Sequence, residues 1–343
     1  MSKNSDQAVL PKQSAENEYK IPWGRTIVGL LISAGCVWYF SRSIDVAQLG
    51  SAFQSARIGS IIWAVLVIVL TGFAKAWRWQ WLYFPAVPKF WPTFQALMTG
   101  QVINLVSPIP RLGDVARLYQ MQRSSQLTVG QTLGTIVTEK SFDLLLTVLL
   151  AVIIIPFFAV PDFISEQLLS LALVVVFLVV ALYVVVFQAG RLLKLTEVVI
   201  RPLPERIGNF IYKLADRSLA GLAVLKNGRI TFYLVLLSAG IGILSFLTPL
   251  LIFYAFDLPY GIAEALLMNA VLTLSISIPS APGRIGTFET FVVSVLLLFG
   301  FQDEAVSLAY ALVYHAVVVV PTLIIGGVAL ALSDWKLGDL RSQ

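Results

Sequence analysis

Long apolar stretches are the feature of this chain that most restricts how it can fold. Six of them are long and apolar enough to cross the hydrocarbon core of a bilayer, which takes roughly 20 residues of helix. Because 58% of the residues are hydrophobic and only 13% are charged, the composition excludes an ordinary soluble domain. The sequence therefore predicts an all-α polytopic membrane protein. We expect transmembrane helices near residues 26–40, 58–74, 139–158, 167–187, 230–254 and 304–332.

Two further apolar regions are interrupted by proline and glycine. The first reads INLVSPIPRLGD from Ile103 to Asp114, and the second reads IPSAPGRIGTFE from Ile278 to Glu289. Proline removes a backbone donor and glycine allows backbone shapes closed to other residues, so each helix must break. Broken backbone at membrane depth is tolerated only where it is buried in protein or lines a watery cavity, which makes both breaks candidate transport sites. The residues that form them are Pro108, Pro110 and Gly113 in the first break and Pro279, Pro282, Gly283 and Gly286 in the second.

The distribution of lysine and arginine predicts how the chain crosses the membrane, since cytosolic segments are enriched in these residues. Region 90–138 starts at a basic flank and emerges into a second one, Arg111, Arg117 and Arg123, so we expect a re-entrant hairpin that opens to the cytosol. Region 265–300 is expected to be a second re-entrant hairpin that opens to the outside. The two halves then form an inverted repeat with both hairpin tips near the midplane. In the alternative, each hairpin is two full crossings, which gives eight or more spans and places those three arginines outside.

The two membrane halves are joined by a basic connector. Residues 188–229 hold eight basic and three acidic residues, with apolar residues near helical spacing. This pattern favours a basic amphipathic helix on the inner leaflet over a plain linker. We expect a disordered cytosolic tail at 1–25, membrane half one at 26–187, the connector at 188–229, membrane half two at 230–332 and a cytosolic tail at 333–343.

Arg111 and Arg284 follow the two breaks at equivalent positions. A guanidinium at membrane depth is costly unless it is paired, and its planar fork of donors suits a phosphate. The functional interpretation is that the two arginines hold a phosphate headgroup in successive stages of a crossing. The structural alternative is that each arginine neutralises a local acid, Asp114 or Glu289, or caps a helix.

A charged step, TEKSFD, begins the third predicted span. Its Glu139 and Asp143 share one helix face, and Lys140 can reach Asp143 three residues on. The step is either a proton-coupling or amine-binding site, or self-neutralising charge near the interface. Histidine in general can change charge near neutral pH, but a lone histidine among apolar residues, as His315 is in the last span, favours a hydrogen-bonded packing role.

Catalysis and metal binding have little support in the sequence. One cysteine, Cys36, and one histidine cannot form an intrachain disulfide or build a structural zinc site, so we expect no metal and no cofactor. The segment KLTEVVIRP (Lys194–Pro202) fits an element of lipid phosphatases, but their chemistry needs two histidines and this chain has one. Walker loops, nucleophile elbows and HExxH motifs are also absent from the sequence. We therefore expect a protein that is not an enzyme.

Three motifs make the chain resemble the transmembrane region of the lysylphosphatidylglycerol synthases, also called the flippase-like family. They read PIPRLGDVAR, EKSFD and PSAPGRIGTFE, and the resemblance covers most of residues 25–332. Bifunctional members carry a soluble aminoacyltransferase domain after this region, whereas this chain looks like a stand-alone member, so we do not expect the aminoacylating activity. The resemblance implies the motif positions Pro110, Arg111, Gly113, Asp114, Arg117, Glu139, Asp143, Pro279, Pro282, Gly283, Gly286 and Glu289.

The resemblance implies a lipid flippase or scramblase-like transporter that moves an anionic phospholipid or a polyprenyl-phosphate-linked lipid between leaflets. The expected partners are membrane lipids with phosphate headgroups and a lipid-modifying enzyme or glycosyltransferase, and no nucleic acid. We expect a multi-pass protein of a bacterial or archaeal cell (inner) membrane with both termini in the cytosol. The residues expected to bind substrate are Arg111, Arg284, Asp114, Arg117, Glu139, Asp143 and Glu289.

Two rival functions stay open at the level of sequence. A proton-coupled secondary carrier for a small anionic solute would use Glu139, Asp143 or His315 to carry protons. A closed polar cavity would favour that carrier, whereas a groove open laterally to lipid would favour lipid transport. A non-transporting scaffold for a lipid-modifying enzyme would use residues 188–229 as its docking surface.

Overall fold

The described part of the computed structural model is helical, and no strand occurs in it. Together with its long apolar helices, this confirms an all-α polytopic membrane protein. The two predicted tails, the predicted span at 26–40, most of the span at 167–187, and Pro108, Pro110 and Pro279 lie outside the described residues. The structure describes residues 46–107, 111–125, 127–154, 187–201, 204–275 and 281–332, and the single positions 173, 177, 180, 181 and 184.

Three of the described helices are long and apolar enough to span a bilayer: α3 (Ile58–Trp81), α11 (Gly228–Ala255) and α14 (Glu304–Ala331). Side-chain caps begin two of them. The Asn227 side-chain oxygen accepts from two backbone N–H groups at the start of α11, and an Asp303 oxygen accepts from one at the start of α14. These helices correspond to the second, fifth and sixth predicted spans.

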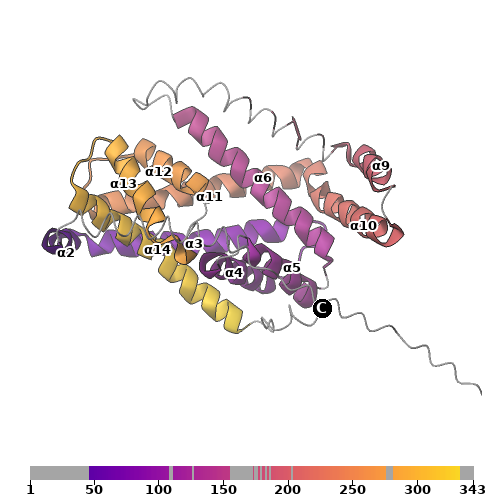
Figure 1. Cartoon of the computed structure of the whole chain (residues 1–343), viewed down its shortest axis with the longest axis horizontal. Helices are drawn as coiled ribbons and strands as arrows, with labels where there is room; N and C mark the ends of the chain where they lie inside the picture. The colour runs from indigo at the N-terminus through magenta and orange to yellow at the C-terminus, as the bar shows by residue number, and fades with distance from the viewer. Residues whose placement is uncertain are drawn as a thin grey trace, which may run out of the picture.

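Helices α3 and α11 pack side by side and run in opposite directions (Figure 1). At one end the Arg57 N–H donates to the Ala255 carbonyl at 2.8 Å, and toward the other end the Trp77 indole N–H donates to the Tyr233 hydroxyl at 2.8 Å. Helix α3 precedes the first break and α11 the second, so the long helices that lead into the two breaks run in opposite directions. An inverted repeat has this geometry.

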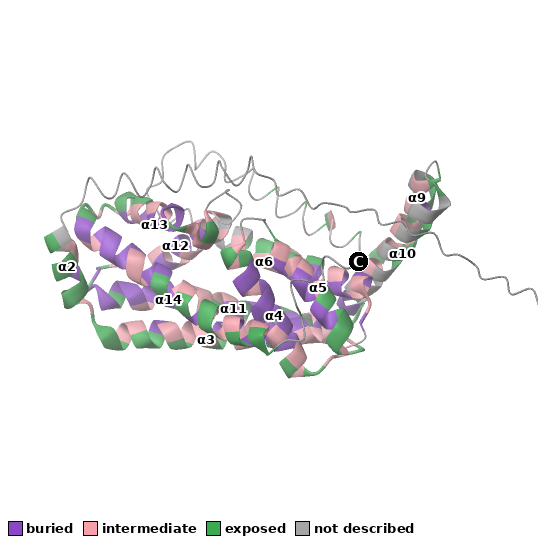
Figure 2. Cartoon of the chain, turned by 60° about the horizontal axis from the view of Figure 1, so that its bottom comes forward, coloured by how far each residue is buried: buried purple, intermediate pink, exposed green. Residues whose placement is uncertain are grey.

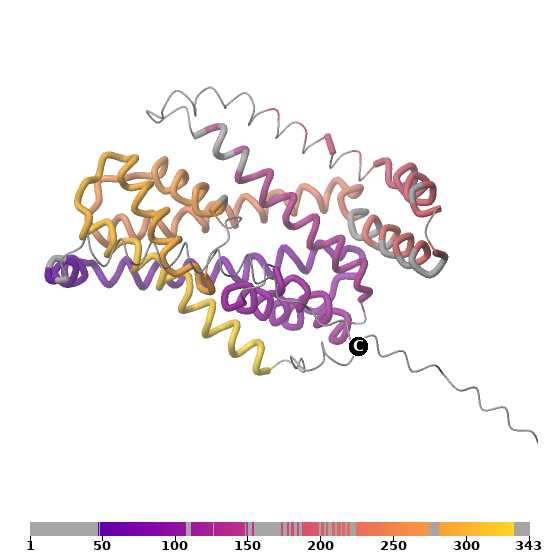
Figure 3. The backbone as a smooth tube through the Cα atoms, viewed as in Figure 1, coloured from indigo at the N-terminus to yellow at the C-terminus, as the bar shows by residue number. Residues whose placement is uncertain are grey.

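Two pairs of short helices lie between the long ones. Helices α4 (Phe90–Val106) and α5 (Leu112–Ser125) follow α3, whereas α12 (Ile262–Ser275) and α13 (Thr287–Leu298) follow α11. Figures 1 and 3 show the two pairs in opposite halves of the molecule. The helix that closes each half contacts the pair of the other half, because α14 packs on α4 while α6 (Val129–Ile154) packs on α12. This reciprocal packing supports the inverted repeat. That each pair of short helices enters the bilayer from one side and returns to it stays a prediction.

Two helix boundaries differ from those expected. Helix α6 begins at Val129, so Glu139 lies inside the helix and not at its start. Helix α3 extends to residue 81, and its KAWRWQW end is partly core, since Arg78 is 1% and Trp79 is 0% exposed. Arg78 turns inward because it donates to Asp143 on α6 at 2.7 Å. Hydropathy could not reveal this, because the acidic partner is far away in the sequence.

The hydrophobic core has two main parts, one around each pair of short helices. Figure 2 shows buried residues concentrated on α4 and its neighbours and exposed ones along α3. Small residues allow the closest contacts in the first half. Gly113 on α5 crosses Gly100 on α4 so closely that a Cβ on Gly113 would lie 1.8 Å from the Gly100 carbonyl oxygen, and a Cβ on Gly326 of α14 would lie 2.7 Å from the Val102 side chain.

The predicted connector is helical where it is described. It contains α9 (Ala189–Ile200), α10 (Glu205–Leu222) and the short 3-10 helix η2 (Ala223–Lys226). Helix α10 packs against α6 as well as α9, so this region is attached to the first half by more than its two ends. Its position on a membrane surface stays a prediction. A further short helix, α2 (Val46–Ser55), precedes α3 and contacts α14.

Candidate functional site

The two helix breaks share a local conformation at their arginines. Arg111 has a φ of 61° and Arg284 a φ of 59°, a left-handed backbone that residues other than glycine adopt uncommonly. Arg111 directly precedes α5, and Arg284 ends the 3-10 helix η3 (Pro282–Arg284) just before α13. The two positions paired by sequence therefore also share a backbone conformation just before a helix.

Neither arginine pairs with the acid nearest to it in the sequence. Asp114 lies 3.5 Å from Arg117, and Glu289 lies 2.5 Å from His315. Within the described residues the guanidinium groups of Arg111 and Arg284 have no ion-pair partner, and Arg111 is exposed while Arg284 is half-buried. These contacts therefore do not support the structural alternative in which a nearby acid neutralises each arginine. Two cations are left available at equivalent positions.

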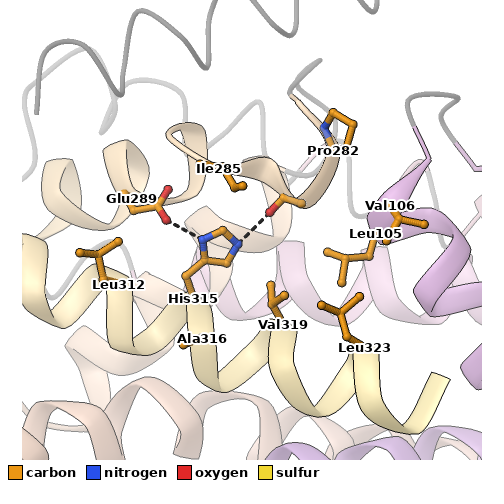
Figure 4. A pocket seen from close by; sticks show the side chains of 11 residues that line it. Leu105, Val106, Pro282, Ile285, Glu289, Leu312, His315, Ala316, Val319 and Leu323 are labelled. Atoms are coloured by element: carbon orange, nitrogen blue, oxygen red, sulfur yellow. Dashed lines mark hydrogen bonds and ion pairs between the residues drawn. The ribbon is translucent and has the colours of Figure 1, made fainter. Parts of the chain in front are cut away.

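The last turn of α4, just before the first break, and the second break line one groove of about 480 Å³ (Figure 4). The end of α4 supplies one wall, the second break and α13 supply another, and α14 forms the floor. Its rim is apolar and outward-facing, since Val106 is 53%, Ile285 57% and Leu323 39% exposed. Glu289 and His315 are the ionisable residues among those that line it. The lining residues are Leu105, Val106, Pro282, Gly283, Ile285, Glu289, Leu312, His315, Ala316, Val319 and Leu323.

His315 and Glu289 form a buried pair in the groove. The His315 Nδ1 atom lies 2.5 Å from Glu289 Oε1, and Nε2 lies 2.8 Å from the Gly283 carbonyl oxygen. The imidazole also stacks on Phe288, with ring centroids 4.6 Å apart. The second Glu289 oxygen accepts from the Gly286 N–H at 2.7 Å, which ties the start of α13 to the same pair.

The sequence predicts a packing role for His315 and does not connect it to Glu289. The ring does pack, yet it also joins the second break to α14 and faces the groove. The two residues lie 26 positions apart on different helices, so no spacing rule would have paired them. The one signal in the sequence is the rarity of the residue, because the chain contains a single histidine.

A second group of charges is buried away from the groove. Arg117 on α5 contacts Glu139 on α6 at 2.5 Å, and its guanidinium carbon lies 3.9 Å above the ring of Trp79. Arg117 is 3% and Glu139 is 5% exposed. Lys140 contacts Glu139 at 3.2 Å and not the expected Asp143.

Asp143 belongs to another interhelical pair. Its partner Arg78 on α3 also donates to Ser238 on α11 at 3.1 Å, so this arginine links three long helices. None of Asp114, Arg117, Glu139 and Asp143 lines the groove. The contacts give the PIPRLGDVAR and EKSFD motifs a part in joining helices, whereas the third motif faces the groove.

A smaller cavity of about 130 Å³ lies among α3, α4 and α14. Lys75 and Gln101 are among the residues that line it. This cavity borders the opposite face of α14 from the groove, through Val318, Thr322 and Ile325. In the described part of the chain, no group of three or more histidine, cysteine and acidic residues gathers as a metal site would require.

Long apolar helices and two broken helix pairs define a multi-pass membrane protein. The chain matches the family described as lysylphosphatidylglycerol synthase TM region over residues 26–326, and it belongs to that family. Neither a curated protein nor a solved structure gives a significant match. Membership supports a role connected with membrane lipids.

Proposed function

We propose that the protein is a flippase or scramblase-like transporter that moves an anionic phospholipid or a polyprenyl-phosphate-linked lipid between leaflets. The observation that carries the proposal is the apolar groove between the end of α4 and the second break. Its exposed apolar rim suits the chains of a lipid where they leave the groove for the bilayer. Arg111 and Arg284 do not line the groove, but Arg284 follows the lining residue Gly283 and Arg111 follows the first break. Their guanidinium groups, which have no ion-pair partner among the described residues, suit a phosphate headgroup.

The arrangement in the membrane follows from the two pairs of short helices. In the proposed arrangement, α4 with α5 enters from the cytosolic side and α12 with α13 from the outside, both as re-entrant hairpins. Arg111 then serves the inner leaflet and Arg284 the outer one. The protein would lie in a bacterial or archaeal cell membrane with both termini cytosolic, and it would move its lipid without chemically changing it.

The shape of the groove favours a lipid over a small anionic solute. A carrier for a small solute encloses its cargo in a closed polar cavity. Here exposed apolar side chains such as Val106 and Ile285 form the rim, and such contiguous apolar surface suits lipid. A lipid can place its headgroup in the groove while its chains stay in the bilayer.

Lipid translocation in proteoliposomes tests the proposal. Headgroup-labelled phosphatidylglycerol and a polyprenyl-phosphate analogue are supplied separately, and the change in accessible label is followed over time. We expect the wild type to move one of these lipids. Arg111→Ala and Arg284→Ala should each reduce the rate at least tenfold, because loss of a charge-assisted contact to phosphate costs about 1.5–3 kcal/mol.

Two exposed arginines provide matched controls. Arg229→Ala removes a cation at the start of α11, and Arg57→Ala removes one before α3, both away from the two helix breaks. Both controls should retain wild-type rates. Absence of movement by a folded wild type would contradict the transport function. Unchanged rates in both Arg111→Ala and Arg284→Ala would instead remove only the headgroup role of the arginines.

A further inference from the structure

We propose that the Glu289–His315 pair is a proton site whose occupancy is coupled to the anionic headgroup, so that one proton accompanies one lipid into the groove. The proposal rests on lipid transport and adds a coupling ion to it. It starts from the three polar contacts of the pair and from the position of both side chains in the groove.

The contacts define where the proton lies. A carbonyl oxygen only accepts, so the Gly283 carbonyl requires an N–H on Nε2 of His315. Nδ1 and the Glu289 oxygen, 2.5 Å apart, then need one proton between them, because two bare acceptors at that distance repel. The pair with this proton has zero net charge, either as imidazolium with carboxylate or as imidazole with carboxylic acid. Without the proton its net charge is −1.

Few other charges face the pair. Arg284 lies next to Gly283 in the second break, but its side chain is not among the groove-lining groups. Helix α4 contributes Leu105 and Val106, which are apolar, and α13 contributes Glu289 itself. Lys75 of α3 borders the cavity on the other face of α14, and α2 and α11 contribute no groove-lining residue. The protonation of the pair therefore dominates the charge inside the groove.

Electrostatics links this proton to the headgroup. Glu289 is 4% and His315 9% exposed, so charges beside them are weakly screened. A phosphate in the groove is repelled by the pair when its charge is −1 and not when it is neutral. By linkage, lipid binding favours the protonated pair as much as protonation favours lipid binding. The proton is taken from water on one side and returned to water on the other, and no other bond changes.

The variant Glu289→Gln separates coupling from folding. A glutamine amide donates to His315 Nδ1 through its nitrogen and accepts from the Gly286 N–H through its oxygen, so both contacts are kept. Because the new amide N–H occupies Nδ1 and no carboxylate is left beside it, we expect the groove to stay neutral across the pH range of the assay. Glu264→Gln is the matched control, because Glu264 accepts from the Gly261 N–H at 2.9 Å at the start of α12 and lies outside the groove.

The first measurement is translocation of labelled phosphatidylglycerol with and without a pH gradient of either sign. In the wild type and in Glu264→Gln, one sign of gradient should accelerate movement. In Glu289→Gln, the rate with a gradient of either sign should equal the rate without one. A gradient effect that persists in Glu289→Gln, or is absent from a wild type that moves lipid, would overturn the coupling and leave lipid transport standing.

The second measurement observes the proton directly. His315 is the only histidine of the chain, so ¹⁵N-histidine labelling gives a single-site nuclear magnetic resonance signal of its protonation. In the wild type, phosphatidylglycerol should extend the doubly protonated or shared-proton signal to higher pH than a zwitterionic lipid does. In Glu289→Gln this lipid effect should be lost. Identical wild-type titrations in the two lipids would refute the proton site, whether or not transport is seen.

Discussion

Arg117→Met lowers the free energy of unfolding by about 3–5 kcal/mol, because buried Glu139 loses its partner on α5 and keeps, among the described residues, only the contact with Lys140, a half-exposed neighbour on its own helix. Arg117 contacts Glu139 at 2.5 Å and lies over the Trp79 ring, and the arginine and glutamate are 3% and 5% exposed. Denaturant unfolding of the detergent-solubilised protein, followed by tryptophan fluorescence, measures the change. The effect should be among the largest of any single substitution, since α5 and α6 lose their buried ion pair.

Two further variants assign the effect to the buried charge. Arg57→Met removes a cation from an exposed pair with Asp257, in which both side chains are 62% exposed, and should cost about 0–1 kcal/mol. Arg117→Met combined with Glu139→Met replaces both charges with apolar groups and should recover most of the loss. Wild-type stability of the single variant Arg117→Met would show that the pair does not stabilise the contact between α5 and α6.

Gly113→Ala separates the first pair of short helices. The new Cβ would lie 1.8 Å from the Gly100 carbonyl oxygen and 2.7 Å from the Gly100 carbonyl carbon, and a backbone cannot turn away as a flexible side chain can. Overpacking usually costs ~1–3 kcal/mol, and a clash with backbone belongs at or above the upper end. Thermal unfolding measures the stability, and lipid translocation measures whether the end of α4 still meets the groove.

Gly240→Ala is the control for a glycine inside a helix. A Cβ at Gly240 in α11 meets nothing within 4 Å, and alanine is favoured over glycine in a helix by about 1 kcal/mol. This variant should therefore be as stable as the wild type or slightly more stable. A Gly113→Ala protein that unfolds like Gly240→Ala would contradict the close crossing of α4 and α5.

Much of the architecture follows from local patterns in the sequence. Apolar runs of sufficient length predict the spans, and the repeated Pro/Gly breaks predict two interrupted helix pairs. The same repetition predicts the equivalence of Arg111 and Arg284, and their nearly equal φ values support it. These features are predictable because backbone chemistry and hydropathy act over a few neighbouring residues.

The sequence by itself determined that this chain is an all-α membrane protein with two matched breaks, because proline, glycine and long apolar runs act locally. Only the tertiary structure decided which charges are neutralised. Glu139 and Asp143 look alike on one helix face, yet they pair with Arg117 of α5 and Arg78 of α3. Glu289 meets His315, and the two break arginines are left without ion-pair partners among the described residues. Charge pairing depends on contacts between distant helices, and no local pattern records those contacts.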